Sequence, residues 1–295
     1  GVSPKDPWPF EGKGRLLSAP SKAGASFRLS GTLTPPSGTT PSQINLETKD
    51  LDPQLLWSFA PSLLPSPAPT GLLDAELEYQ GRSLKDFRSR GKVRFHPLHF
   101  SDPHAFLQPF HLESAFLTYQ LSLDDKGINL QELALKAGDF SMEGNLSAQR
   151  LPTGNWQMAA QCSTSPFLFE EAKLYLPWKV FHPQLAKFLG EKVWDGKITS
   201  FTLKTKGKLE ELRDFKEAIR RGLSTGEFAF QGPSLRFSDE LSPLENLNGS
   251  AILKEGKLYF QETTGNWQTS QITKAEGVLG LFVEETPLDL TFNIR

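Results

Sequence analysis

The nearest match to a catalytic motif is residues 222–226, which have the Gly-x-Ser-x-Gly spacing of the nucleophile elbow of lipases and esterases. In that elbow a strand precedes the serine and a helix follows it, which exposes the nucleophilic hydroxyl. Around Ser224 the order is reversed, because a helical pattern (DFKEAIRR) precedes the serine and a strand pattern (GEFAFQG) follows it. We therefore interpret the motif as a helix end flanked by glycines, and we expect no catalytic residue and no enzyme.

Four of the five histidines lie close together in the sequence, at His96, His99, His104 and His111. Zinc sites use three or four such ligands. However, no helical histidine pair accompanies them, and the single cysteine, Cys162, supports neither a cysteine-based zinc site nor an intrachain disulfide. On a strand, His96 and His99 point to opposite faces. We interpret the group as scattered surface histidines, and we expect neither a metal nor another cofactor.

The pentapeptide TGNWQ occurs twice, at residues 153–157 and 264–268. We interpret each copy as a Gly-Asn turn that leads into a strand beginning with Trp156 or Trp267. The alternative is a carbohydrate-binding sandwich in which the two indoles stack on a sugar. The acidic pairs at 124–125 and 284–285 have no evident catalytic partner.

Composition and charge exclude several classes of function. Hydrophobic residues make up 38% of the chain, although there are 22 Phe and 6 Trp. Few apolar residues, many of them large, favour a sheet with one apolar face over a thick core. The net charge of −2 argues against nucleic-acid binding, and the basic residues of 82–94 alternate with apolar ones as on a solvated strand face. No apolar run approaches the roughly 18 residues of a membrane helix.

Alternation of apolar and polar residues with a period of two dominates the sequence and predicts strands. It is clearest at residues 73–79, 115–123, 140–148 and 288–294. Short Gly-containing turn sequences recur between the strands and favour antiparallel hairpins. Helical patterns are short, and we expect helices only at residues 52–60, 182–192 and 208–221.

The order of these patterns repeats along the chain. The tripeptide Pro-Gln-Leu occurs at 53–55 and again at 183–185, each time inside a predicted short helix. Each helix is followed by a glycine, Gly71 or Gly196, and by an alternating strand. The sequence therefore predicts two stacked repeats of one β-unit.

The repeat resembles a known family. Residues 174–212 (LYLPWKVFHPQLAKFLGEKVWDGKITSFTLKTKGKLEEL) resemble AsmA-like proteins of the bacterial envelope, especially the YhdP-like branch. The matching elements are Leu176-Pro177, the helix after Pro183, Gly196, the strand over 198–206, and Gly207 followed by Leu209. Residues 241–281 also fit the family pattern, and residues 50–150 fit it more weakly.

The resemblance implies an elongated, curved antiparallel sheet that forms a taco-like open groove, with a few short helices. It implies that residues 1–49 end a preceding β-repeat, that 50–150 form a groove repeat, and that 151–295 form another with two short helices. It implies phospholipid binding and conduction along the groove between the inner and outer membranes. It also implies a periplasmic location. It implies, too, a membrane anchor in a segment outside this chain.

Candidate groove residues follow from the apolar faces of the predicted strands. They are Leu77, Tyr79, Leu117, Tyr119, Leu121, Phe140, Met142, Phe201, Leu203, Phe228, Phe230, Leu290 and Phe292. A one-residue slip in register would move every one of them to the opposite face. Alternation is equally compatible with a closed sandwich core, so a structural or protein-binding β-scaffold of the envelope is the alternative function.

Overall fold

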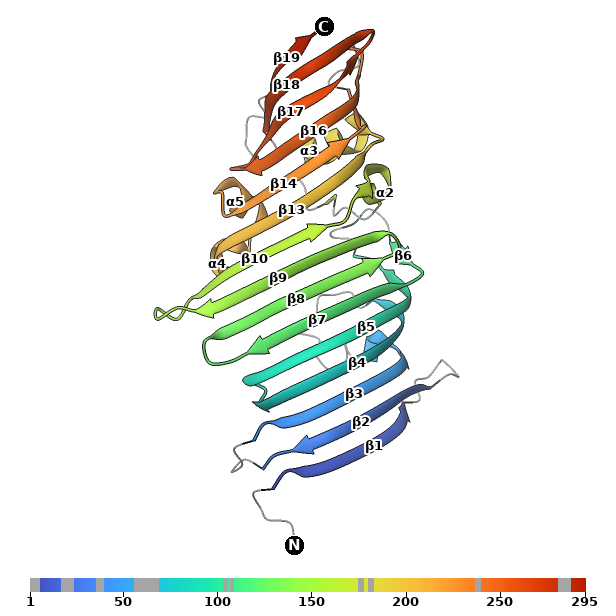
Figure 1. The fold of residues 1–295 in the computed structure, drawn as a ribbon, viewed down its shortest axis with the longest axis vertical. Helices are drawn as coiled ribbons and strands as arrows, with labels where there is room; N and C mark the ends of the chain where they lie inside the picture. The colour runs from blue at the N-terminus through green and yellow to red at the C-terminus, as the bar shows by residue number, and fades with distance from the viewer. Residues whose placement is uncertain are drawn as a thin grey trace. The chain divides into compact units, whose positions relative to one another are not determined.

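The computed structural model describes residues 6–16, 24–35, 40–55, 69–102, 106, 109–174, 178–179, 183–236, 240–280 and 288–295. The described strands belong to one open antiparallel sheet of 19 strands, and the helices are few and short (Figure 1). The expectation of a mainly β fold with an open antiparallel sheet is therefore confirmed. The chain divides into two compact units: unit 1 is Gly1–Asp102 with Pro109–Arg150, and unit 2 is Pro103–Gln108 with Leu151–Arg295.

Unit 1 contains nine of the strands, each pairing with the next along the chain except around β6. The short β6 and the longer β7 pair with different parts of β5. The strands are β1 (Trp8–Leu16), β2 (Ala25–Leu33), β3 (Ser42–Leu51), β4 (Thr70–Ser83), β5 (Asp86–Phe100), β6 (Phe110–Leu112), β7 (Ala115–Leu123), β8 (Gly127–Ala137) and β9 (Phe140–Arg150).

The register of unit 1 places apolar residues in rows that cross the strands. Residues directly paired in an antiparallel ladder share a face, so a row of partners is also a row on one face. One such row consists of Gly12, Leu29, Leu46, Leu77, Gly91, Tyr119, Leu133 and Gly144. This face is the apolar face of unit 1.

The opposite face of unit 1 is polar. Its rows contain the basic residues of β5, which lie beside acidic residues of β4. Arg90 forms an ion pair of 2.7 Å with Glu78, and on neighbouring strands Arg28 lies 3.8 Å from Glu47. The basic run of residues 82–94 is thus a solvated strand face, as predicted from its alternation.

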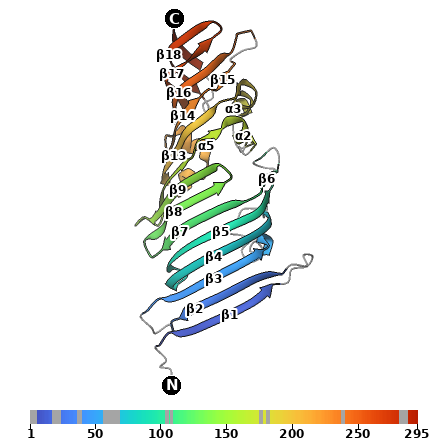
Figure 2. The same cartoon turned by 45° about the vertical axis from the view of Figure 1, so that its right-hand side comes forward.

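Unit 2 combines ten strands with short helices, and α2 and α3 lie together on one side of its strands (Figure 2). The longer strands pair in the order β10-β13-β14-β16-β17-β18-β19. The elements are β10 (Trp156–Thr164), β11 (Phe167–Leu168), α2 (Phe169–Lys173), α3 (Pro183–Lys187), the π-helix η1 (Phe188–Lys192), β12 (Val193–Trp194), β13 (Lys197–Lys208), α4 (Leu209–Leu212), α5 (Phe215–Arg220), β14 (Ser224–Gln231), β15 (Ser234–Leu235), β16 (Leu244–Lys254), β17 (Lys257–Trp267), β18 (Ser270–Gly280) and β19 (Leu288–Ile294).

The predicted helices are present but shorter or divided. The segment 182–192 forms α3 and η1, with residue 182 outside the described part. Of the segment 52–60, residues 53–55 are helical and 56–60 lie outside the described residues. The segment 208–221 is two helices, because Asp214 leaves helical geometry to cap α5 and its carboxylate accepts a 3.0 Å hydrogen bond from the Glu217 N–H.

One of the two predicted TGNWQ turns is wrong. The first copy forms a turn at 152–154, and β10 begins at Trp156. In the second copy the Gly-Asn pair lies inside β17, which ends at Trp267, and the turn falls at residues 268–269. The register of β17 shifts between Thr263 and Gly265, so this Gly-Asn pair accommodates a bulge rather than a hairpin turn.

A substitution at Gly91 can test the packing of the apolar row of unit 1. A Cβ at Gly91 would lie 2.6 Å from both Leu77 Cδ2 and Tyr119 Cε1, its neighbours in the row. Tyr119 is restrained because its hydroxyl lies 3.0 Å from Ser89 Oγ in a hydrogen bond. We therefore expect Gly91→Val to lower the free energy of unfolding by about 1–3 kcal/mol in urea denaturation.

The matched control is Gly12→Val, which changes a glycine of the same row. A Cβ at Gly12 meets no atom within 4 Å, and valine favours extended backbone. This variant should be neutral or slightly stabilising. Equal destabilisation by both variants would contradict the packing of the row around Gly91.

Candidate functional site

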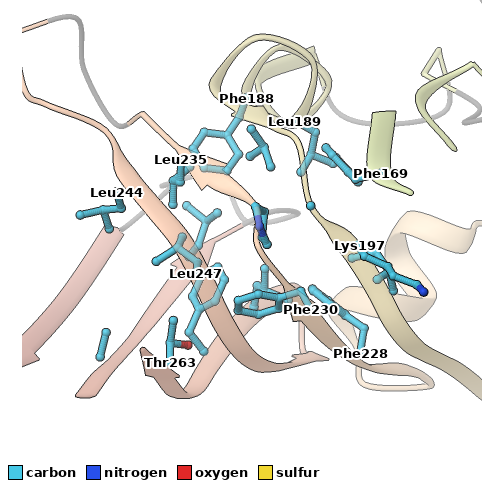
Figure 3. Close-up of a pocket in the computed structure, with 18 of the residues that line it drawn as sticks. Phe169, Phe188, Leu189, Lys197, Phe228, Phe230, Leu235, Leu244, Leu247 and Thr263 are labelled. Carbon is cyan, nitrogen blue, oxygen red and sulfur yellow. The ribbon is translucent and has the colours of Figure 1, made fainter. Parts of the chain in front are cut away.

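The candidate site is an apolar cavity of about 290 Å³ in unit 2, between the sheet and its helices (Figure 3). Its volume lies at the lower end of the range of small-molecule pockets. Among the described lining residues, polar side chains belong only to Lys197, Thr263 and Glu276. A cavity with such walls suits an apolar ligand.

The floor of the cavity is the apolar face of the sheet in unit 2. One row of paired residues on this face consists of Phe201, Phe228, Ala251, Phe260, Gly277 and Leu290. Large and small side chains alternate in part of this row, which leaves depressions between rings. Phe230 packs edge-on against Phe260, with their ring centroids 6.4 Å apart. The floor is therefore ridged rather than flat.

A bulge in β13 adds a residue to the floor. Ile198 and Phe201 are three positions apart, so simple alternation would place them on opposite faces. The register with β14 shifts between Ile198 and Ser200, so Ile198 pairs with Phe230 and Phe201 pairs with Phe228. Both side chains therefore face the cavity, and both line it.

The roof of the cavity comes from α2 and η1, which contribute Phe169, Ala172, Phe188 and Leu189 (Figure 3 labels all but Ala172). The helix α2 is attached to the sheet at its first residue, since the Phe169 N–H donates to the Gly196 carbonyl at 3.1 Å. The φ of Gly196 is +75°, and a Cβ there would collide with the backbone of Pro233. Only glycine suits this attachment.

Lys173 also fixes the roof. Its Nζ donates to the Val193 carbonyl at 2.6 Å and to Glu170 Oε1 at 2.7 Å, and it lies 5.1 Å from the centre of the Phe169 ring. The Trp178 indole N–H donates in turn to the Lys173 carbonyl at 2.7 Å. Because the lysine side chain is only 15% exposed, these contacts hold α2 against β12 in a partly desolvated position.

The structure divides the predicted groove residues between the two units. Five of the six in unit 2 line the cavity: Phe201, Phe228, Phe230, Leu290 and Phe292. The sixth, Leu203, lies on the same face of the sheet but is not part of the lining.

Leu203 pairs with Gly226 on one side and with Cys162 on the other. Burial raises the pKa of the Cys162 thiol, although a hydrogen bond with the Leu203 backbone opposes the shift. This thiol is thus a weak nucleophile.

The seven predicted groove residues of unit 1 share the apolar face of that unit and are half-buried: Leu77, Tyr79, Leu117, Tyr119, Leu121, Phe140 and Met142. The phenol of Tyr79 donates to the Ser83 carbonyl at 3.0 Å. Burial, with a contribution from Asp86, raises the pKa of Tyr79. The tyrosines therefore present their rings to this face and direct their hydroxyls to polar partners.

None of the roof residues was among the predicted groove residues: Phe188 and Leu189 lie in the helix expected at 182–192, whereas no helix was expected at 169–173, which contributes Phe169 and Ala172. A signal for this helix exists: Pro166 precedes it, and Glu170 and Glu171 occupy its first turn, where acidic residues are favoured. The segment is only five residues long, which is too short for a clear periodicity.

Two of the motifs singled out in the sequence, those around Ser224 and Trp267, lie outside the lining of the cavity. Ser224 begins β14 directly after α5, as the reversed order predicted, and its side chain is 0% exposed. Its Oγ lies 2.9 Å from Thr205 Oγ1 in a hydrogen bond. Trp267 packs against the hydrophobic core of unit 2. Its ring is therefore poorly placed for the sugar stacking considered above.

None of the helices in the described part of the chain is long and apolar enough to cross a membrane. Comparisons of the chain with protein-family models, curated proteins and solved structures found no match.

The burial of Ser224 gives a test of the non-catalytic interpretation. We expect Ser224→Ala to leave any ester hydrolysis by the purified protein unchanged, because a buried hydroxyl bonded to Thr205 cannot reach a substrate. The variant should lose about 1 kcal/mol of stability with the hydrogen bond. Hydrolysis of a p-nitrophenyl ester series by both proteins measures the first effect. Loss of a saturable activity in the variant would contradict this interpretation.

Proposed function

We propose that this protein binds lipid acyl chains without chemical conversion, in the unit 2 cavity and on the apolar faces of its sheet. The observation that carries the proposal is the cavity, whose floor and roof are apolar and which lies on an open sheet. An apolar chain is the ligand class that needs no hydrogen-bonding partner from such walls.

The size of the cavity sets the length of chain it holds. At about 27 Å³ per close-packed methylene, 290 Å³ corresponds to at least about ten methylenes. Transfer of a methylene from water is worth about 0.8 kcal/mol, so the gross gain is about 8 kcal/mol before the cost of association. This gain supports reversible binding of one chain segment.

A phospholipid is the proposed natural ligand, with its head group in water. Any part of the acyl chains that the cavity does not cover would lie along the sheet face. Conduction of phospholipid between the inner and outer membranes is the wider proposal, and it follows from the resemblance to AsmA-like proteins. So do the periplasmic location and attachment to the membranes through segments outside this chain. The open sheet and the apolar face of each unit support this proposal.

A charge placed in the cavity should abolish binding. Phe201 lines the cavity, whereas its neighbour Ser200 is exposed on the opposite face. We expect Phe201→Asp to weaken binding of a fluorescent fatty acid at least tenfold, because a desolvated carboxylate costs several kcal/mol. Ser200→Asp adds the same charge to the same strand and should bind as the wild type does. Fluorescence titration, with decanoate as competitor, measures both affinities.

A second variant separates occupancy of the cavity from damage to the fold. Ala172→Phe adds an apolar side chain from the roof helix α2 and fills part of the cavity without adding charge. It should weaken binding while its melting temperature stays near that of the wild type. If Ala172→Phe and Phe201→Asp both fold and both bind normally, the acyl-chain proposal fails, and the β-scaffold function becomes the better interpretation. Native mass spectrometry of the purified wild type should show lipid adducts.

A further inference from the structure

Two histidines of unit 1 face each other across a short strand pair. His99 of β5 is the direct partner of His111 of β6, between the pairs Leu98–Leu112 and Phe100–Phe110. Their Nδ1 atoms are 2.8 Å apart, and both side chains are exposed. Residues twelve positions apart in the sequence thus present two imidazole nitrogens at one point on the surface.

The contact is a hydrogen bond between the two imidazoles, in which the roles of donor and acceptor depend on the tautomer of each ring. A head-on N–H···N bond of this length would hold the ring centroids about 5 Å apart. The observed separation is 4.1 Å, with 42° between the ring planes, so the two rings do not meet head-on. A cation bound to both Nδ1 atoms would replace the proton that the two nitrogens share.

We propose that His99 and His111 form a binding site for a divalent late transition-metal ion such as Ni²⁺, Cu²⁺ or Zn²⁺, with both Nδ1 atoms as ligands. Metal–imidazole bonds of about 2.0–2.1 Å place two ligand nitrogens about 3.0 Å apart at a right angle and about 3.3 Å apart in a tetrahedron. The present 2.8 Å needs only a few tenths of an ångström of adjustment. Water can complete the coordination because the pair is exposed.

The donor type determines the class of ion. Imidazole nitrogen suits nickel, copper and zinc, whereas magnesium and calcium prefer oxygen ligands. Binding would also link β6, which has only three residues, to the longer β5. An ion that binds only the paired arrangement stabilises it by a free energy that grows with the logarithm of the ratio of ion concentration to dissociation constant.

Another set of possible ligands in unit 1 provides the competing site. Donor atoms of Asp50, Asp74 and His96 lie within 4.8 Å of one another. There, however, Asp74 already accepts a 2.9 Å hydrogen bond from the Asp50 N–H, and its other carboxylate oxygen lies 3.0 Å from His96 Nε2. Both carboxylate oxygens of Asp74 thus already lie against groups of the protein, and the proposed site does not include this set.

The experiment titrates Ni²⁺ into the full chain, free of any affinity tag, by calorimetry at about pH 7.5. We expect one ion per chain, with no response to Mg²⁺. His99→Gln and His111→Gln should each weaken binding roughly a hundredfold, because either change leaves a single ligand and removes the chelate effect. His96→Gln, the matched control, should bind as the wild type does.

A second readout is local to the strand pair. Ni²⁺ should slow hydrogen exchange of the backbone amides of 110–112 in the wild type and have no such effect in His99→Gln. Both substituted side chains are exposed, so circular dichroism should show unchanged folding. The proposal is overturned if Ni²⁺ does not bind, if the two variants bind normally, or if His96→Gln is the variant that loses the ion.

Discussion

Cross-strand register is the constraint on which the rest of this structure depends. In an antiparallel ladder each residue shares its face with its partner, so a single apolar position specifies a row across many strands. In unit 1 such a row runs from Gly12 to Gly144, and in unit 2 another runs from Phe201 to Leu290. Each one-residue shift would exchange the apolar and polar faces. The hairpins set the register, and the register shifts found in many of the described strand pairs adjust it locally.

The cavity of unit 2 depends on which elements cover the apolar face of its sheet. The described strands all belong to one sheet, so no second described sheet packs against the Phe-rich floor. Helices of five residues cover it instead, held by Lys173 and by the Phe169–Gly196 hydrogen bond. Short helices bring few side chains, and the floor alternates large rings with Ala251 and Gly277. Apolar space therefore remains, and an acyl chain is a ligand of suitable chemistry to fill it.

Much of the sheet, and part of the cavity, could be predicted from alternation. The odd-numbered residues of 115–123 share the face of Leu77 and Tyr79, and the period of two was sufficient to assign them. Alternation failed where a bulge changes the count. Ile198 reaches the cavity only because β13 has an extra residue opposite β14, and the Gly-Asn pair at 265–266 lies in a bulged strand rather than a turn. Neither position has a local sequence signal distinct enough to show the irregularity.

The sequence by itself determined the strands, most hairpin turns and the separation of apolar from polar faces, because these depend on neighbouring residues and on a period of two. Tertiary structure alone decided what covers the apolar face of unit 2 and which residues meet across strands. The roof from α2 and η1, the interior position of Ser224 and the 2.8 Å approach of His99 to His111 each join residues distant in sequence. Such contacts depend on strand pairing and on the packing of short helices, which no local pattern encodes.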